Sequence, residues 1–160
     1  MIKKKNIFSA DWKASSHGEK FQHEHIALTD MRDGHELGCG AFRVNPGKRA
    51  FPKHAHLAND EALFIVSGKG ELTVGEEVTE VGAGEFVLLA KGAEHAHVLI
   101  NNGDEDIVYL CISTMNAPEV VYYPDSDKLG VMESPRQWGG KNSVSGFYRY
   151  QKAGYYDGED

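Results

Sequence analysis

The sequence predicts an all-β protein, and three observations support this prediction. The 160 residues contain almost no helical periodicity of useful length. Short alternating or β-branched runs recur instead, with turn residues between them. Glycine makes up 18 of the 160 residues, about 11% against a usual share of about 7%, and such an excess without a repeat is typical of many tight turns. Many short strands at regular spacing favour a sandwich or a barrel.

A strand is expected wherever β-branched and aromatic residues gather between two turns. The expected strands cover residues 21–28, 37–44, 51–56, 62–66, 71–74, 86–89, 95–101, 107–115 and 120–122. The connections between them contain turn residues, as in Asn45-Pro46-Gly47. Before the first strand, residues 11–20 are expected to hold one helical turn.

The chain has the length of one ordinary domain. At this length roughly 70% of the unfolded surface can be buried, so folding requires neither disulfides nor a metal. After Pro124 the sequence becomes polar and rich in glycine, and a segment this short cannot hold a core of its own. We therefore expect residues 1–160 to form a single domain with a barrel core at about 37–115. Residues 116–160 are expected to be a C-terminal extension packed on the barrel or on a partner subunit.

Charge and cysteine content narrow the possible partners. The chain has 17 basic and 24 acidic residues, a net charge of −7, which argues against nucleic acid or an anionic membrane as the main partner. No apolar run approaches the ~20 residues of a membrane span, and the N-terminal residues lack the apolar core of a signal peptide. Cys39 and Cys111 lie far apart in apolar surroundings, which indicates reduced thiols in a cytoplasmic protein.

Histidines form the clearest chemical signal in the sequence. Six of the eight occur in His-x-His pairs, where chance predicts about 0.4 such pairs. The pairs are His23/His25, His54/His56 and His95/His97. Residues i and i+2 of a strand share one face about 6.6 Å apart, so two imidazoles of a pair can bind one ion.

The middle pair has a carboxylate beside it. Glu61 follows His56 at the head of an apolar run, where it can complete a mixed nitrogen and oxygen site or lie in solvent as most glutamates do. The third pair follows a glycine-rich turn about 40 residues later. The two groups can converge if the sheet closes on itself.

At these positions the sequence resembles the cupin superfamily. The first motif of that family is matched by Gly47, His54, His56, Glu61 and Gly68, with one residue more than usual between Gly47 and His54. The resemblance covers about residues 37–115 and implies a double-stranded β-helix. Segments on both sides are similar to a subgroup of bacterial single-domain cupins, sometimes labelled sugar-phosphate-isomerase-like.

The second cupin motif fits in two registers. Its leading positions are matched by Gly84, Ala90 and Gly92, with Ala90 in place of the usual proline. Counting forward from Gly92 selects His95, whereas counting back from the motif asparagine, Asn101, selects His97. We favour His97. His95 would then lie nearer the mouth of the barrel as a candidate acid or base.

The resemblance implies a metal site of His54, His56, Glu61 and His97. Such a set suits one divalent ion, Zn, Ni, Mn or Fe, and leaves two positions open. The implied function is that of a metal-binding cupin acting on a small polar metabolite, sugar-phosphate-isomerase-like or dioxygenase-like. The alternative is a non-catalytic metabolite-binding module. A homodimer is expected because cupin barrels commonly pair.

The residues around the four proposed ligands have no assigned role from the sequence alone. Strand parity places Leu63, Ile65 and Leu99 on the ligand face. No catalytic group stands out among the neighbouring candidates Lys53, Asp60, Glu94 and His95, and the basic residues available for a phosphate are Lys48, Arg49, Lys53 and Lys91. His23 and His25 are interpreted as surface or packing residues, and Asp125 and Asp127 as parts of a solvated turn.

Overall fold

The computed structural model describes residues 3–30, 33–134 and 143–159. The strands are β1 (Lys13–His17), β2 (Phe21–Ala27), β3 (Leu37–Val44), β4 (Ala55–His56), β5 (Glu61–Ser67), β6 (Lys69–Val74), β7 (Glu77–Gly82), β8 (Phe86–Leu89), β9 (His97–Ile100), β10 (Ile107–Thr114), β11 (Glu119–Tyr123), β12 (Lys128–Met132) and β13 (Gly146–Tyr148). The short 3-10 helices are η2 (Ala93–His95) and η3 (Pro124–Ser126). The described residues contain no helix long and apolar enough to cross a membrane.

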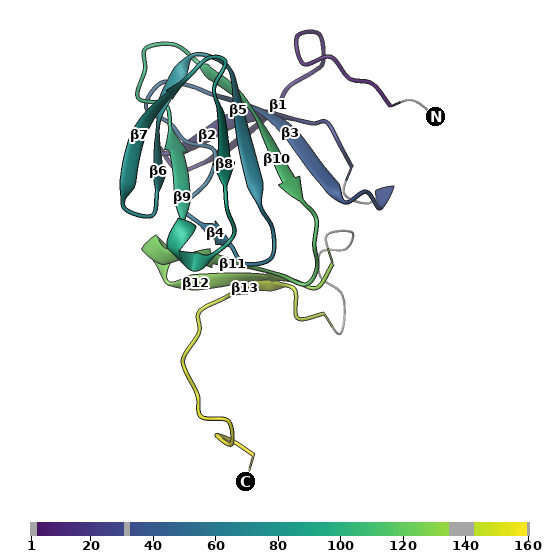
Figure 1. Ribbon diagram of the computed structural model, residues 1–160, viewed down its shortest axis with the longest axis vertical. Helices are drawn as coiled ribbons and strands as arrows, with labels where there is room; N and C mark the ends of the chain where they lie inside the picture. Colours follow the sequence, from purple (N-terminus) through teal and green to yellow (C-terminus); the bar gives the residue numbers. More distant parts are fainter. Residues whose placement is uncertain (1–2, 31–32, 135–142, 160) are drawn as a thin grey trace.

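Two antiparallel sheets form the walls of a barrel (Figure 1). One has the strand order β1-β2-β3-β10-β5-β8, and the other has the order β7-β6-β9. Their inner faces share one core, in which Ile65, Leu72, Leu89 and Ile107 are fully buried. The predicted all-β fold is therefore confirmed, and its arrangement is a double-stranded β-helix.

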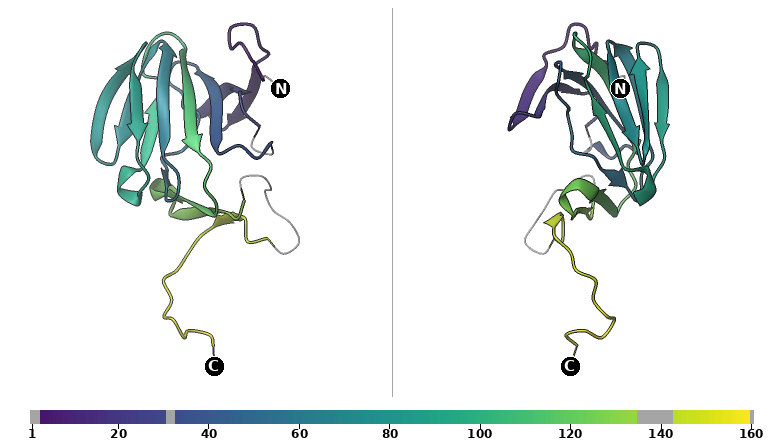
Figure 2. Two further views of the ribbon diagram at one scale, coloured as in Figure 1. Left: turned by 45° about the vertical axis from the view of Figure 1, so that its right-hand side comes forward. Right: turned by 90° about the vertical axis from the view of Figure 1, so that its left-hand side faces the viewer.

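A third sheet lies across one end of the barrel, with the order β13-β12-β11-β4 (Figure 1). β4 comes from the barrel sequence, and Val121 of β11 pairs with His56 of β4. The C-terminal strands thus fix the backbone of a histidine from the first motif. Beyond β13 the chain extends away from the barrel (Figure 2).

The structure corrects several local predictions. The helical turn expected at residues 11–20 is wrong, because Lys13–His17 pairs with β2 in a hairpin. All five residues of β1 are exposed, so its sequence carries no apolar alternation to reveal the strand. β7 was not expected for the same reason, since four of its six residues are exposed. The strand expected at 95–101 begins only at His97, after η2.

Asn101 shows why the second motif contains an asparagine. Its side chain is fully buried and donates from Nδ2 to the carbonyls of Val44 and Glu105, at 2.8 Å each. Its Oδ1 accepts from the Gly103 N–H at 3.0 Å. One side chain therefore ties β9 to β3 and to the turn before β10, which holds His97 in register.

Candidate metal centre

Four side chains from three segments of the barrel converge at the end covered by the third sheet. Glu61 begins β5, His97 begins β9, His54 directly precedes β4, and His56 is the last residue of β4. His54 and His97 form an isolated antiparallel bridge, with N–H to carbonyl distances of 3.0 and 2.7 Å. This pair of backbone hydrogen bonds fixes the first motif against the second.

The ligand atoms lie at the spacing of a coordination shell. His97 Nε2 is 3.1 Å from Glu61 Oε2, and His56 Nε2 is 3.5 Å from Glu61 Oε1. Ligand atoms of His54, His56 and Glu61 all lie within 4.8 Å of one another, and the His54 and His97 ring centroids are 4.7 Å apart. Two ligands about 2.1 Å from one ion would be separated by about 3.0 to 3.4 Å. In the described residues His54, His56 and Glu61 are the group of His, Cys, Asp and Glu that could hold an ion, and His97 adjoins this group through its contact with Glu61.

Backbone carbonyls orient two of the imidazoles. His54 Nδ1 lies 2.8 Å from the Pro52 oxygen, and His97 Nδ1 lies 3.1 Å from the His95 oxygen. Because a carbonyl can only accept, each Nδ1 carries a proton, and each Nε2 is the ring atom left to face the cluster. His97 Nε2 then faces the Glu61 carboxylate: a proton on Nε2 makes this contact a hydrogen bond, and without that proton the two acceptors can hold a cation between them. This donor set fits a divalent metal ion.

Protonation states favour metal binding. Burial alone would raise the pKa of Glu61, but the His97 hydrogen bond and the nearby imidazoles lower it to about 2. Burial and the neighbouring His97 lower the pKa of His54 to about 4. Burial lowers the pKa of His56 as well, yet Glu119 and Glu61 outweigh it and raise the net value. At neutral pH Glu61 is therefore anionic and His54 neutral, the forms that bind a metal.

Sequence reasoning missed Glu119, which lies directly behind the cluster. It is 3% exposed, and its Oε2 is 3.7 Å from His56 Nδ1, on the ring edge away from Glu61. Its carboxylate accepts from the N–H groups of Leu57 and Ala58 at 3.0 and 3.3 Å, and from the Asn59 amide. Glu119 therefore holds the loop after His56 and supplies charge behind that imidazole. No motif marks it, because a buried glutamate in a C-terminal strand has no distinctive spacing.

The cluster opens into a cavity of about 690 Å³ inside the barrel. Besides the cluster, its wall includes His25, Leu63, Leu99, Tyr109, Cys111 and Tyr123. Leu63 and Leu99 lie there as strand parity predicts, whereas Ile65 is packed in the core. Burial and the Glu61 carboxylate raise the pKa of Cys111, so its thiol stays protonated and donates to Glu61 Oε1 at 3.4 Å.

Tyr123 extends this wall with a residue from outside the motifs. Its ring stacks on His54 at 5.9 Å, with 24° between the planes. Burial, aided by the Glu61 charge, raises the pKa of Tyr123. The phenol is therefore a neutral donor at the cavity wall, and it comes from the C-terminal sheet.

His95 does not occupy the position expected for it. It ends η2, and its side chain is 41% exposed with Nε2 3.7 Å from Glu94. The reason is that the strand starts two residues later, so His95 and His97 do not share a strand face. His95 is absent from the cavity wall, which removes it as an acid or base there.

Two lysines expected near the metal cluster, Lys48 and Lys53, donate to backbone carbonyls elsewhere. Lys48 Nζ donates to the Glu19 carbonyl and Lys53 Nζ to that of Gly75, each at 2.7 Å. The lysines that line the barrel cavity are instead Lys5 and Lys13 from the N-terminal segment.

The first histidine pair has two different environments. His23 packs against the rings of Phe42 and Phe51, at 5.8 and 5.5 Å, as a packing role predicts. His25 stacks on Phe42 at 6.3 Å but also lines the barrel cavity. The interpretation of His25 as a packing residue only is thus incomplete, because β2 extends the cavity wall beyond the cupin motifs.

Comparison with known proteins identifies the barrel. The sequence profile of the cupin domain family matches residues 40–113, which include both histidine motifs. The barrel is a cupin domain. No curated protein matches the sequence.

Solved structures show the same fold. The "Putative sugar phosphate isomerase" of Acidithiobacillus ferrooxidans is 26% identical with a TM-score of 0.70, over 83% of this chain and 85% of that one. A sugar phosphate isomerase of the cupin superfamily from Silicibacter pomeroyi is 18% identical with a TM-score of 0.70, over 91% and 92%. The polyketide cyclase RemF of Streptomyces resistomycificus is 23% identical with a TM-score of 0.58, over 71% and 80%. One cupin fold thus supports different chemistries.

Proposed function

We propose that this cupin is a metal-dependent enzyme that isomerises a small polar hydroxy-carbonyl metabolite. His54, His56, Glu61 and His97 hold one divalent ion in this proposal. The convergence of these side chains in a cavity of about 690 Å³ carries it, because both the donor set and the volume suit a metal-bound small molecule. The bound ion supplies Lewis-acid polarisation of a substrate carbonyl.

The cavity wall supplies the protein groups that such a reaction requires. Aldose–ketose isomerisation removes a proton from the carbon beside the carbonyl and returns it to the carbonyl carbon, while the hydroxyl proton crosses to the other oxygen. His25 contributes an imidazole that is not part of the ligand cluster, and imidazole is the commonest group for such transfers. Tyr123, whose ring stacks on His54, contributes a phenol to the cavity wall. We assign His25 as the acid–base residue and Tyr123 as a donor that orients the substrate.

Resemblance supports the same reaction class. The Acidithiobacillus ferrooxidans protein is similar over most of both chains, and its name assigns it to sugar phosphate isomerases. Loading Zn, Ni, Mn and Fe separately before the activity measurement identifies which of these ions supports the reaction.

Proton exchange with solvent tests this function directly. The metal-free protein is loaded with each ion in D₂O and incubated with small aldoses, ketoses and their phosphates, and the substrates are followed by NMR. We expect deuterium at the carbon beside the carbonyl, dependent on metal, and at least 100-fold slower exchange in His25→Gln with the metal retained. Saturable binding of a substrate without deuterium exchange, with every metal tested, would contradict the enzyme proposal. It would instead support the alternative, a metabolite-binding module.

We also propose that the protein is a homodimer. The outer face of β5 and β8 carries Phe64 and Phe86, which pair across the strands, and Leu88 beside them. Phe86 and Leu88 are 61% and 67% exposed. A flat apolar sheet face can bury itself against an identical copy through a two-fold axis.

The free thiols Cys39 and Cys111 support a reducing compartment such as the cytoplasm.

A further inference from the structure

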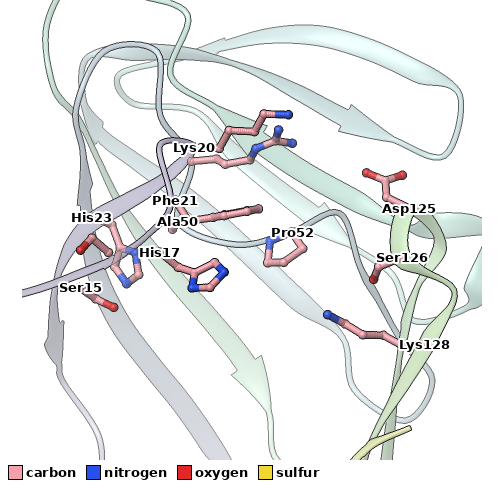
Figure 3. Close-up of a pocket in the computed structure, with 12 residues that line it drawn as sticks. Ser15, His17, Lys20, Phe21, His23, Ala50, Pro52, Asp125, Ser126 and Lys128 are labelled. Atoms are coloured by element: carbon pink, nitrogen blue, oxygen red, sulfur yellow. The ribbon is translucent and has the colours of Figure 1, made fainter. Parts of the chain in front are cut away.

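A second cavity lies outside the barrel, between the β1–β2 hairpin and the segment from η3 to β12 (Figure 3). Its volume is about 510 Å³. We call it the outer cleft and define it by Lys20, Arg49, Lys128, Ser15 and Ser126. Figure 3 shows Lys20 on one side of the cleft and Lys128 on another, with Ser126 beside it.

The outer cleft is cationic although the chain as a whole has a net charge of −7. Lys20, Arg49 and Lys128 line it, against the single carboxylate of Asp125 among its described lining residues. Within the part of the chain that the structure describes, none of these three cations has a carboxylate within 4.0 Å. A cleft that collects unpaired charge of one sign concentrates ions of the opposite sign.

Arg49 is held in place without using its side-chain donors. Its backbone N–H donates to the Lys20 carbonyl at 3.1 Å, and Arg49 forms an isolated parallel β-bridge with Phe21. The guanidinium lies over the Phe21 ring, 5.3 Å from its centroid. Among the described residues no acceptor receives a hydrogen bond from the guanidinium. A stacked guanidinium with free N–H groups is ordered for a planar, two-point contact with an oxyanion.

Lys128 links the outer cleft to the metal centre. Its ammonium lies 4.9 Å from the Tyr123 centroid and 5.7 Å from that of Phe147. The same Tyr123 ring stacks on His54. Pro52, whose carbonyl accepts the His54 Nδ1–H, lines both cavities.

We propose that the outer cleft is a phosphate-binding site. Arg49 donates two N–H groups to the phosphate, and Lys20 and Lys128 add positive charge to the cleft around it. The phosphate has two chemical sources, free inorganic phosphate or the phosphoryl group of a small phosphate monoester. This site lies outside the metal centre and does not depend on the proposed isomerase activity.

Calorimetric titration of the full chain with inorganic phosphate tests the proposal, with ionic strength held constant by chloride. We expect saturable binding of one phosphate per chain. Arg49→Gln and Lys128→Gln should each weaken it at least tenfold, and Arg49→Lys should weaken it because a lysine cannot make the two-point contact. Lys91→Gln removes the same charge from an exposed position outside both cavities and should leave the affinity unchanged.

A second titration separates the two sources. If inorganic phosphate is the ligand, its affinity exceeds that of glucose 6-phosphate. If a monoester is the ligand, glucose 6-phosphate binds more tightly than phosphate, and Arg49→Gln removes that advantage. Circular dichroism of each variant verifies the fold, and a misfolded Arg49→Gln leaves Lys128→Gln as the deciding variant. The proposal would be overturned if neither phosphate nor glucose 6-phosphate bound saturably. It would also be overturned if Lys91→Gln weakened binding as much as Arg49→Gln and Lys128→Gln do.

Discussion

His97 Nε2 lies 3.1 Å from Glu61 Oε2, although 36 residues separate them in the chain. β9 and β5 belong to different sheets, so this contact spans the interior of the barrel. The hydrogen bond from His97 Nδ1 to the His95 carbonyl turns Nε2 toward the carboxylate. Without a proton on Nε2, His97 and Glu61 present two acceptors that a cation can bridge, and the fold places His54 and His56 beside them.

Substitution of Glu119 tests whether its charge behind His56 strengthens metal binding. Glu119→Gln removes the negative charge 3.7 Å from His56 Nδ1 while keeping an oxygen for the loop amides. We expect metal affinity to fall about 10- to 100-fold, the range typical of such outer carboxylates. Competition with a chelating dye measures it. Glu77→Gln, at an exposed position of β7, is the matched control, and equal affinity in both variants would exclude this role.

The stability of the metal-free protein should depend on pH through His54. Its pKa is about 4 in the folded protein and 6.5 in the reference state, so the unfolded chain binds more protons between these values. Stability is thus complete above pH 6.5 and falls as the pH drops to about 4, by at most about 3 kcal/mol. Glu61, with a pKa of about 2, adds a loss only below pH 4.5.

Urea denaturation between pH 7 and pH 4 measures this slope. His54→Gln lacks the titrating group, and its stability should change less across that range than that of the wild type. The raised pKa of His56 acts in the opposite direction, because its contribution is lost as the pH rises above 6.5. A slope unchanged in His54→Gln would show that another group governs acid unfolding.

Asn101 should be structural and not a ligand. Asn101→Ala leaves the carbonyls of Val44 and Glu105 and the N–H of Gly103 without their partner inside the fold. We expect a loss of about 3 kcal/mol of stability, since each unpaired buried group costs about 1 to 3 kcal/mol. One metal ion per chain should remain at saturating metal. The neighbouring Asn102 is exposed, and Asn102→Ala should change neither quantity.

The proposed homodimer rests on the outer face of β5 and β8. Phe86→Ser and Leu88→Ser each remove an exposed apolar side chain from that face and should shift the mass from twice 17.7 kDa toward 17.7 kDa at micromolar concentration. Light scattering coupled to size exclusion measures the mass. Val78→Ser, which alters a 57% exposed residue of the other sheet, should leave the dimer intact. A wild-type mass of 17.7 kDa would refute the dimer.

Spacing in the sequence predicted which four side chains the barrel brings together. His54 lies just before β4, His56 ends it, and Glu61 follows at the start of β5, in the order that the first motif gives them. His97 was favoured over His95 by its distance from Asn101, and the structure places His97, not His95, beside Glu61. These positions could be predicted because each belongs to a motif, although the second motif needed Asn101 to choose between its two registers.

Other parts of the site depend on long-range pairing that spacing does not encode. Glu119 reaches His56 only because β11 pairs with β4, and Tyr123 reaches His54 through the same strand. His25 joins the cavity wall because β2 pairs with β3, outside the cupin motifs. Exposed strands such as β1 and β7 carry no apolar alternation, so their pairing partners alone define them.

Metal binding by His97→Ala tests the central claim most directly, with His95→Ala as the matched control two residues away. Each protein is loaded with Zn²⁺ or Mn²⁺, dialysed, and analysed for ions per chain. We expect one ion in the wild type and in His95→Ala, whose side chain is outside the cavity. His97→Ala should lose more than 100-fold in affinity, beyond the 10- to 100-fold effect of outer residues. A metal retained by His97→Ala, or lost from His95→Ala, would contradict the assignment of these four side chains as the metal site.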